Sequence, residues 1–143
     1  MKSLFLAMVL SLSSILCFAT PNEKVLSSFA TSFPKADSVS WYENDNSYEV
    51  HFNMGEVHCR LWYDKDGAVT KSIRYYLQSM LPPIVLSRVQ HKYAEKSVYG
   101  VTEVTTPEDG VQYFIILQDD KKWYDVTSDA SGNLTLTKKF NKA

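Results

Sequence analysis

The chain contains an internal repeat, and this repeat limits its fold more than any other feature. The segment 25–27 (VLS) returns as 85–87, and the alternating segment 48–52 (YEVHF) returns as 113–117 (YFIIL). Single residues also match: Phe29 with Val89, Phe33 with Tyr93, Asp64 with Asp129, and Gly67 with Gly132. A duplicated module explains this pattern, because one copy alone buries too little apolar surface and two copies together make a wider core.

Each copy is expected to begin with an amphipathic helix. Val25, Phe29 and Phe33 recur at a spacing of four residues, and the second copy repeats this spacing. Such a stripe must be buried against another element. Pro34 is expected to end the first helix because proline lacks an N–H and clashes with the preceding turn. Pro82-Pro83 stands at the start of the second helix, where proline is tolerated.

Alternation with a period of two predicts strands after each helix. Tyr48, Val50 and Phe52 share one face, whereas Glu49 and His51 share the other. A turn at Met54-Gly55 predicts five pairs: Phe52 with Val57, Val50 with Cys59, Tyr48 with Leu61, His51 with His58, and Glu49 with Arg60. In the second copy, a turn at 118–121 predicts pairing of Ile115 with Tyr124 and of Ile116 with Trp123.

The expected fold class is α+β, with tandem duplicated helix–β4 modules forming an antiparallel sheet that has two helices packed on one face. The first repeat is expected to span residues 20–80 and the second residues 81–143, both within one compact domain. The helices would cover one face of the sheet, and the other face would stay partly open.

The first 19 residues are typical of a secretory signal peptide. Lys2 precedes an apolar run from Leu4 to about Phe18, and Cys17 and Ala19 occupy the −3 and −1 positions of a cleavage site after Ala19. The alternatives are a retained membrane helix and a lipoprotein signal cut before Cys17, although the latter prefers a small residue where Leu16 stands. The sequence therefore predicts a periplasmic or secreted protein.

The remaining 124 residues (143 minus 19) suit one compact unit. Removing Lys2 changes the formal charge from −1 to −2, and no basic block exists, so nucleic acid is not expected as a partner. No later stretch is apolar over the roughly 18 residues that a membrane span requires. Cys59 is then the single cysteine, so packing rather than an internal disulfide must stabilise the fold.

Three patterns raise the possibility of chemistry. His51 and His58, with Glu49, could bind zinc or copper, but a structural site needs four ligands and a catalytic site three. The segment 64–67 (DKDG) begins like a calcium loop but lacks the later ligands. Cys59 lies on the core face, where a thiol is inert. No catalytic motif occurs, so we expect no enzyme activity, no metal and no cofactor.

The open sheet face remains as the candidate site. Tryptophan, phenylalanine and arginine on an exposed surface are common anchors of protein–protein contacts. Strand alternation predicts eight residues on this face: His51, His58, Arg60, Trp62, Phe114, Ile116, Trp123 and Asp125. A loop, a terminus or a second copy of the chain could instead cover these side chains, and the sequence indicates no particular oligomeric state.

Several motifs in order resemble the PepSY-like family, also called the β-lactamase-inhibitor-protein-like family. They are the segments 33–36 (FPKA), 48–52 (YEVHF), 62–67 (WYDKDG) and 81–82 (LP), together with Trp41. The match covers nearly the whole chain after the signal peptide. The second half departs from the family pattern, because Tyr93-Ala94 stands where Phe-Pro is expected.

The resemblance implies a secreted or periplasmic protein with a duplicated helix-plus-sheet module and no enzyme activity. It suggests binding or inhibition of a protein, such as a secreted or periplasmic enzyme, and supplies no catalytic residue. An alternative function is binding of a small molecule or envelope component in a groove between the repeats, lined by Trp41, Tyr42, Tyr75 and Tyr76.

Overall fold

The computed structural model describes residues 20–143, so the predicted signal peptide lies outside the described residues. The first repeat begins with a helix, α1 (Glu23–Ser32). Its four strands follow in order: β1 (Asp37–Asn44), β2 (Ser47–Met54), β3 (Val57–Asp64) and β4 (Val69–Tyr76). A short 3-10 helix, η1 (Gln78–Met80), leads into the second repeat.

The second repeat has the same order of elements. It begins with α2 (Pro83–Lys92), which has the same length as α1. Its strands are β5 (Ser97–Thr106), β6 (Gly110–Gln118), β7 (Lys122–Asp129) and β8 (Leu134–Asn141). The predicted series of one helix and four strands therefore occurs twice.

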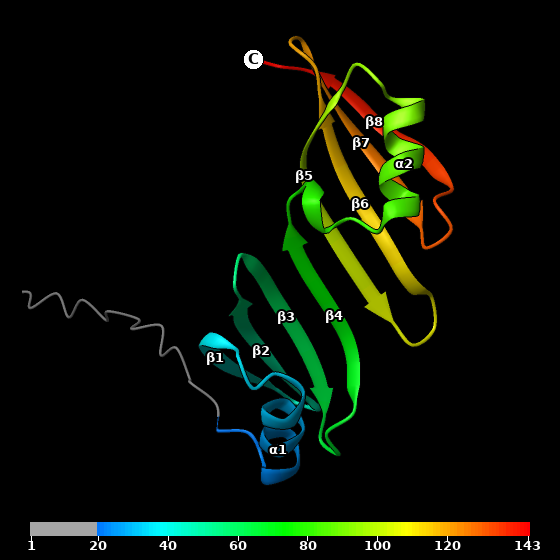
Figure 1. The fold of residues 1–143 in the computed structure, drawn as a ribbon. Coiled ribbons are helices and arrows are strands. Elements are labelled where there is room, and N and C mark those ends of the chain that lie inside the picture. Colours follow the sequence, from blue (N-terminus) through cyan, green and yellow to red (C-terminus); the bar gives the residue numbers. More distant parts are fainter. Residues whose placement is uncertain (1–19) are drawn as a thin grey trace, which may run out of the picture.

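All eight strands form one antiparallel sheet in the order in which they occur along the chain. The two repeats join where β4 pairs with β5. Both helices lie on the same face of the sheet (Figure 1). The predicted α+β class and the helix-covered face are confirmed.

The helix ends follow from local chemistry. The Asn22 side chain accepts a hydrogen bond from the Val25 N–H at 3.0 Å, which satisfies one of the free donors of the first turn of α1. The α1 helix ends at Ser32, before Pro34, as expected. Pro83 is the first residue of α2. A backbone N–H at this position would have no hydrogen-bond acceptor within the helix, so proline is tolerated there.

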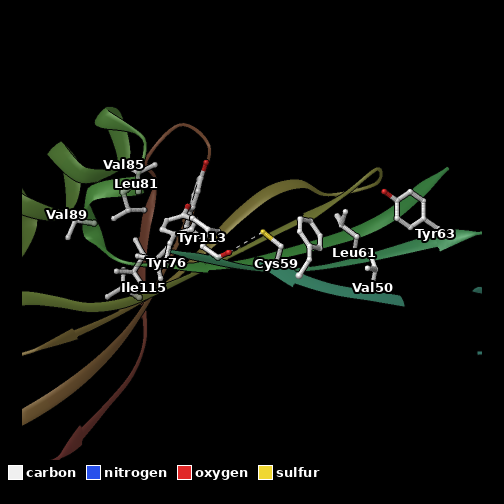
Figure 2. Packing of buried hydrophobic residues seen from close by; sticks show 14 of the residues in the cluster. Val50, Cys59, Leu61, Tyr63, Tyr76, Leu81, Val85, Val89, Tyr113 and Ile115 are labelled. Carbon is white, nitrogen blue, oxygen red and sulfur yellow. Dashed lines mark hydrogen bonds between the residues drawn. The ribbon is translucent and has the colours of Figure 1, made fainter. Parts of the chain in front are cut away.

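The core lies between the helices and the sheet and runs through both repeats. Val25 and Phe29 of α1, and Val85 and Val89 of α2, are buried against the sheet. At the junction, Cys59, Tyr76 and Tyr113 lie between the two helix-covered regions (Figure 2). The other buried apolar strand residues are Tyr48, Val50, Phe52, Val57, Leu61, Tyr63, Val101, Ile115, Leu117, Tyr124 and Val126. Every strand residue that alternation assigned to the core in 48–63 is therefore buried.

One buried polar atom is left without a partner in the described part of the chain. The Tyr63 side chain is fully buried beside Trp41, and its hydroxyl makes no hydrogen bond. Burial raises the pKa of Tyr63 to about 12.

We predict that Tyr63→Phe leaves the free energy of unfolding unchanged or raises it by up to about 1 kcal/mol, because removing an unpaired buried hydroxyl avoids its desolvation cost. Urea denaturation of the two proteins measures this. A loss of more than about 1 kcal/mol would mean that the hydroxyl is paired, for example by a buried water molecule.

The predicted register of the β2–β3 hairpin is wrong by two residues. Phe52 pairs with Cys59 and Val50 with Leu61, while His51 pairs with Arg60 rather than with His58. The turn consists of Gly55-Glu56 instead of Met54-Gly55. A glycine fits the first central position of such a turn because this position requires a positive φ, which is 60° at Gly55. A shift of two residues keeps every side chain on its predicted face.

The β6–β7 register is corrected in the same way. Ile115 pairs with Val126 and Ile116 with Asp125, so the turn begins one residue later than expected. Asp119 holds this turn: its carboxylate accepts the backbone N–H groups of residues 121 and 122 and the Tyr124 hydroxyl, the last at 2.6 Å. The Tyr124 hydroxyl and these N–H groups lower the pKa of Asp119 to about 2, from an ordinary value of 3.8.

We predict a pH dependence from this turn. Because the folded-state pKa lies below the unfolded-state value, the contribution of Asp119 to stability is fully present above about pH 4 and is lost as the pH falls towards 2. Wild type should be more stable than Asp119→Asn at pH 6, and the difference should shrink between pH 4 and pH 2. Thermal unfolding at a series of pH values measures it, and a difference that is constant with pH would contradict the prediction.

Candidate functional site

We use the name open face for the sheet surface opposite the helices. Side chains alternate between the two faces of a strand, so the neighbours of a buried residue point to the open face. The buried residues are Val50 on β2, Leu61 on β3, Ile115 on β6 and Val126 on β7. All eight predicted site residues belong to these alternate positions. Phe114 is 43% exposed and Ile116 38% exposed, so the helices leave large apolar side chains in contact with solvent.

Glu49, His51 and Arg60 form one charged cluster on the open face. Arg60 Nη2 lies 2.5 Å and His51 Nε2 lies 2.6 Å from Glu49 Oε1, and Arg60 Nε lies 3.1 Å from His51 Nε2. Burial opposes ionisation of Glu49, but hydrogen bonds from His51 and Arg60 outweigh it, so the pKa of Glu49 lies below its ordinary value. The hydrogen bond to Glu49 raises the pKa of Arg60. Arg60 is therefore a fixed cation at this site.

Trp62 lies close to two cations. The Arg60 guanidinium is 5.0 Å and the Lys71 ammonium 5.1 Å from its ring centroid, and Lys71 is the cross-strand partner of Trp62 on β4. Cation–π attraction holds these side chains near the ring. The result is a half-buried tryptophan with positive charge beside it. Lys71 was not predicted, although its place on the open face follows from the β3–β4 pairing.

The two histidines do not form the metal pair that was considered. His58 pairs with Asn53 and lies 2.7 Å from its side-chain oxygen, while His51 contacts Glu49 and Arg60. No group of three metal-ligating side chains occurs within residues 20–143. The two-residue shift in register is the physical reason, because it places Arg60 where His58 was expected.

The turn at 64–67 and the Cys59 thiol have structural explanations. Asp64 Oδ1 accepts the backbone N–H groups of Asp66 and Ala68, both at 2.9 Å, so this carboxylate closes the β3–β4 turn. Cys59 is buried, its Sγ lies 3.8 Å from the Val57 carbonyl oxygen, and burial raises the pKa of the thiol. A buried thiol with a raised pKa is a poor nucleophile.

The second repeat contributes a shallow hollow of about 440 Å³ to the open face. Phe114 and Ile116 form its apolar part, and the cross-strand pair Asp125 and Lys138 brings a carboxylate and an ammonium to its border. Thr102, Ile115, Val126, Thr127 and Thr137 complete the lining. This hollow brings together three predicted residues, Phe114, Ile116 and Asp125.

Trp123 lies in a separate aromatic group near one end of the open face. Its ring centroid is 4.8 Å from that of Tyr99 in an edge-to-face arrangement, and the Lys142 ammonium lies 4.8 Å from it. Phe140 pairs with Trp123 on β8 and is 48% exposed. Tyr99 and Phe140 were not predicted. A register irregularity between Val98 and Gly100 hides the position of Tyr99, whereas Phe140 could have been found by its alternation in β8.

Cross-strand pairing connects the two parts of the open face. His58 pairs with Tyr75, Tyr75 with Thr102, and Thr102 with Phe114, so one row of side chains crosses from β3 to β6. The charged aromatic cluster of the first repeat and the hollow of the second therefore belong to one continuous surface.

The alternative groove between the repeats is not formed by the four expected residues. Trp41 packs on Phe29 and Tyr63 on the helix side, and Tyr76 is buried on that side as well. Tyr42 contacts His51 on the open face, where Tyr75 also lies. Side chains on opposite faces of a sheet cannot line one pocket, so this prediction is wrong.

Solved structures with the same fold come from Bacteroides. A BLIP-like protein from Bacteroides fragilis is 16% identical, with a TM-score of 0.63 over 87% of this chain and 89% of that chain. A DUF2874 family protein from Bacteroides ovatus is 26% identical, with a TM-score of 0.61 over 86% of this chain and 89% of that chain. A protein from Bacteroides eggerthii, described provisionally as periplasmic, is 17% identical, with a TM-score of 0.60 over 86% and 90%.

These likenesses support a BLIP-like fold. No protein-family model matches the sequence, and no curated protein matches it. The PepSY-like name therefore stays a prediction. No helix among residues 20–143 is long and apolar enough to cross a membrane.

Proposed function

We propose that this chain is a non-enzymatic periplasmic or secreted protein that binds another protein through its open face, and that the partner is a secreted or periplasmic enzyme which it inhibits. One observation carries the proposal: tryptophan, phenylalanine and arginine side chains gather on the sheet face that the helices leave uncovered. The N-terminal sequence and the provisional periplasmic description of one structural neighbour support the compartment.

The composition of the open face favours a protein over a small ligand. Exposed Phe114 and Ile116 offer apolar contact, while Arg60 and Lys71 place positive charge beside Trp62. Tryptophan and arginine supply much of the binding energy in protein interfaces, usually from positions near the centre. These residues come from several strands, so the surface suits a broad partner better than a compact ligand.

The proposed mechanism is steric. The hollow at Phe114 and Ile116 accepts a large apolar side chain from the partner, and the cations around Trp62 attract carboxylates near it. If the bound segment borders an active site, the sheet covers the site and excludes substrate. No catalytic step by this chain is required.

A capture experiment tests the proposal. Residues 20–143 carrying a tag are incubated with periplasmic extract from the host, alongside the double variant Trp62→Ala/Trp123→Ala and a control variant, Leu26→Ala. Leu26 is 38% exposed on α1, away from the open face. A partner retained by wild type and the control but lost by a folded double variant would support the proposal.

Affinity and inhibition are then measured with the purified partner. Removal of an anchor side chain should weaken binding at least about 30-fold, which corresponds to about 2 kcal/mol. Binding should also inhibit the partner if it is an enzyme. Equal affinity of wild type and the double variant would refute the role of the open face, and binding without inhibition would refute the inhibitory role.

A further inference from the structure

A second hollow lies on the other side of the molecule, between α2 and the β7–β8 turn. Its volume is about 420 Å³, and α2 runs beside β8 here (Figure 1). It is lined by Arg88, His91, Lys92, Gly132, Asn133 and Leu134. Among the described residues, three basic side chains and no carboxylate line this hollow. The open face does not include any of these residues.

The three basic residues occupy one side of the last two turns of α2, at i, i+3 and i+4. Arg88 and Lys92 carry like charges at i and i+4 and repel one another, which destabilises a helix slightly. The ion pairs found among residues 20–143 do not include Arg88, His91 or Lys92, so no carboxylate lies at salt-bridge distance from these three side chains. Basic side chains are favoured in the last turn of a helix, where they interact with its carboxyl end, and this accounts for the presence of His91 and Lys92. It does not account for Arg88, which lies before the last turn.

The repeat provides an internal comparison. The two helices correspond at a spacing of sixty residues, with buried Val25 and Phe29 matching Val85 and Val89. Arg88, His91 and Lys92 therefore correspond to Ser28, Thr31 and Ser32 of α1, which are all uncharged. The helix–sheet packing forms without basic residues in the first repeat, so the fold itself does not require them in the second.

The local geometry brings the basic groups to the turn. A Cβ atom added at Gly132 would lie 2.9 Å from Arg88 Cγ, so the arginine stem passes directly over this glycine. Lys92 Nζ donates to the Leu134 carbonyl oxygen at 3.0 Å. Asp129, the carboxylate of the turn, accepts hydrogen bonds from the backbone N–H groups of Ser131 and Asn133 and from the Asn133 side-chain amide. Asp64 closes the equivalent turn of the first repeat, so Asp129 has the same structural task.

We infer that this hollow binds a phosphate- or sulfate-type oxyanion. A guanidinium can bind two oxygens of such a group at once, the nearby ammonium adds charge, and the imidazole adds a hydrogen-bond donor. The group could belong to a soluble molecule or to an anionic lipid headgroup, since both present the same oxygens. This site is independent of the open face and of the partner proposed for it.

The test is a titration of ¹⁵N-labelled residues 20–143 with pyrophosphate at low ionic strength, followed by NMR, with sodium chloride at matched ionic strength as the control. Saturable shifts are expected for the amides of residues 88–92 and 132–134. The variant Arg88→Ser/His91→Thr/Lys92→Ser, which copies the residues of α1, should bind at least about tenfold more weakly, a difference of about 1.4 kcal/mol. Arg88→Lys keeps the positive charge but loses the planar guanidinium that binds two oxygens at once. Its affinity for pyrophosphate should lie between those of wild type and the triple variant.

Shifts that are spread over other lysines, that also occur with chloride, or that persist in the folded triple variant would overturn the inference. If the triple variant does not fold, the position of the shifts in wild type and the result with Arg88→Lys still decide it. Sedimentation with vesicles of phosphatidylglycerol, compared with phosphatidylcholine, separates the two sources. Binding to the anionic vesicles that the triple variant loses indicates a headgroup, whereas pyrophosphate binding without vesicle binding indicates a soluble ligand.

Discussion

Gly67→Ala is expected to lower the free energy of unfolding by about 2–5 kcal/mol. Gly67 has a φ of 89°, and a side chain at such an angle costs about 1–2 kcal/mol. The added Cβ would also lie 3.2 Å from the Lys24 carbonyl oxygen in the first turn of α1, so the turn and the helix would have to separate. Overpacking of this kind adds about 1–3 kcal/mol. Urea denaturation of residues 20–143 measures the loss.

Gly55→Ala is the matched control for this prediction. Gly55 also has a positive φ, 60°, but no atom lies within 4 Å of an added Cβ. Its replacement should therefore cost only the backbone contribution, about 1–2 kcal/mol. The difference between the two variants isolates the close approach of the β3–β4 turn to α1. Equal losses of unfolding free energy in the two variants would contradict the prediction, because they would show that α1 accommodates the added methyl group without destabilisation.

The side-chain faces could be predicted from the sequence because they depend only on alternation. Val50, Phe52, Cys59 and Leu61 are all buried, although their predicted partners were wrong. Register depends on where a turn begins. A two-residue turn that begins one residue later shifts the pairing by two residues, which changes every cross-strand pair but leaves each side chain on the same face. Gly55 could have corrected this, since the first central position of the turn suits glycine far better than methionine.

The composition of the candidate site could be predicted only in part. Trp62 and Phe114 follow from the strand pattern, but the contacts around them depend on which strands pair. Lys71 reaches Trp62 because β4 lies beside β3, and Lys138 meets Asp125 because β8 lies beside β7. Tyr99 is displaced by an irregularity in β5, which no local pattern indicates. The basic hollow beside α2 requires both the helix and a turn that lies forty residues further along the chain.

The junction between the repeats also depends on contacts that are distant in sequence. Glu103 on β5 accepts hydrogen bonds from the Tyr76 hydroxyl at 2.5 Å and from the Arg74 guanidinium at 3.1 Å, both on β4. Tyr76 is buried, and burial together with the hydrogen bond to Glu103 raises the pKa of its hydroxyl. This group of three joins the last strand of one repeat to the first strand of the other.

Glu103→Ala is expected to lower the free energy of unfolding by about 3 kcal/mol, because it leaves the buried Tyr76 hydroxyl without an acceptor and Arg74 without its carboxylate. Glu103→Gln, which can still accept one hydrogen bond, should lose about 1 kcal/mol. The exposed Glu108→Ala is the control and should stay within about 0.5 kcal/mol of wild type.

A double-mutant cycle separates the hydrogen bond from other effects of the substitution. Tyr76→Phe should destabilise the wild-type protein but have little effect when Glu103 is already alanine, because its acceptor is then absent. Additive losses would contradict the proposed coupling. If both repeats form one compact domain, tryptophan fluorescence and far-ultraviolet circular dichroism should report the same single transition in every variant. Two separate transitions in Glu103→Ala would instead mean that the carboxylate is what makes the repeats unfold together.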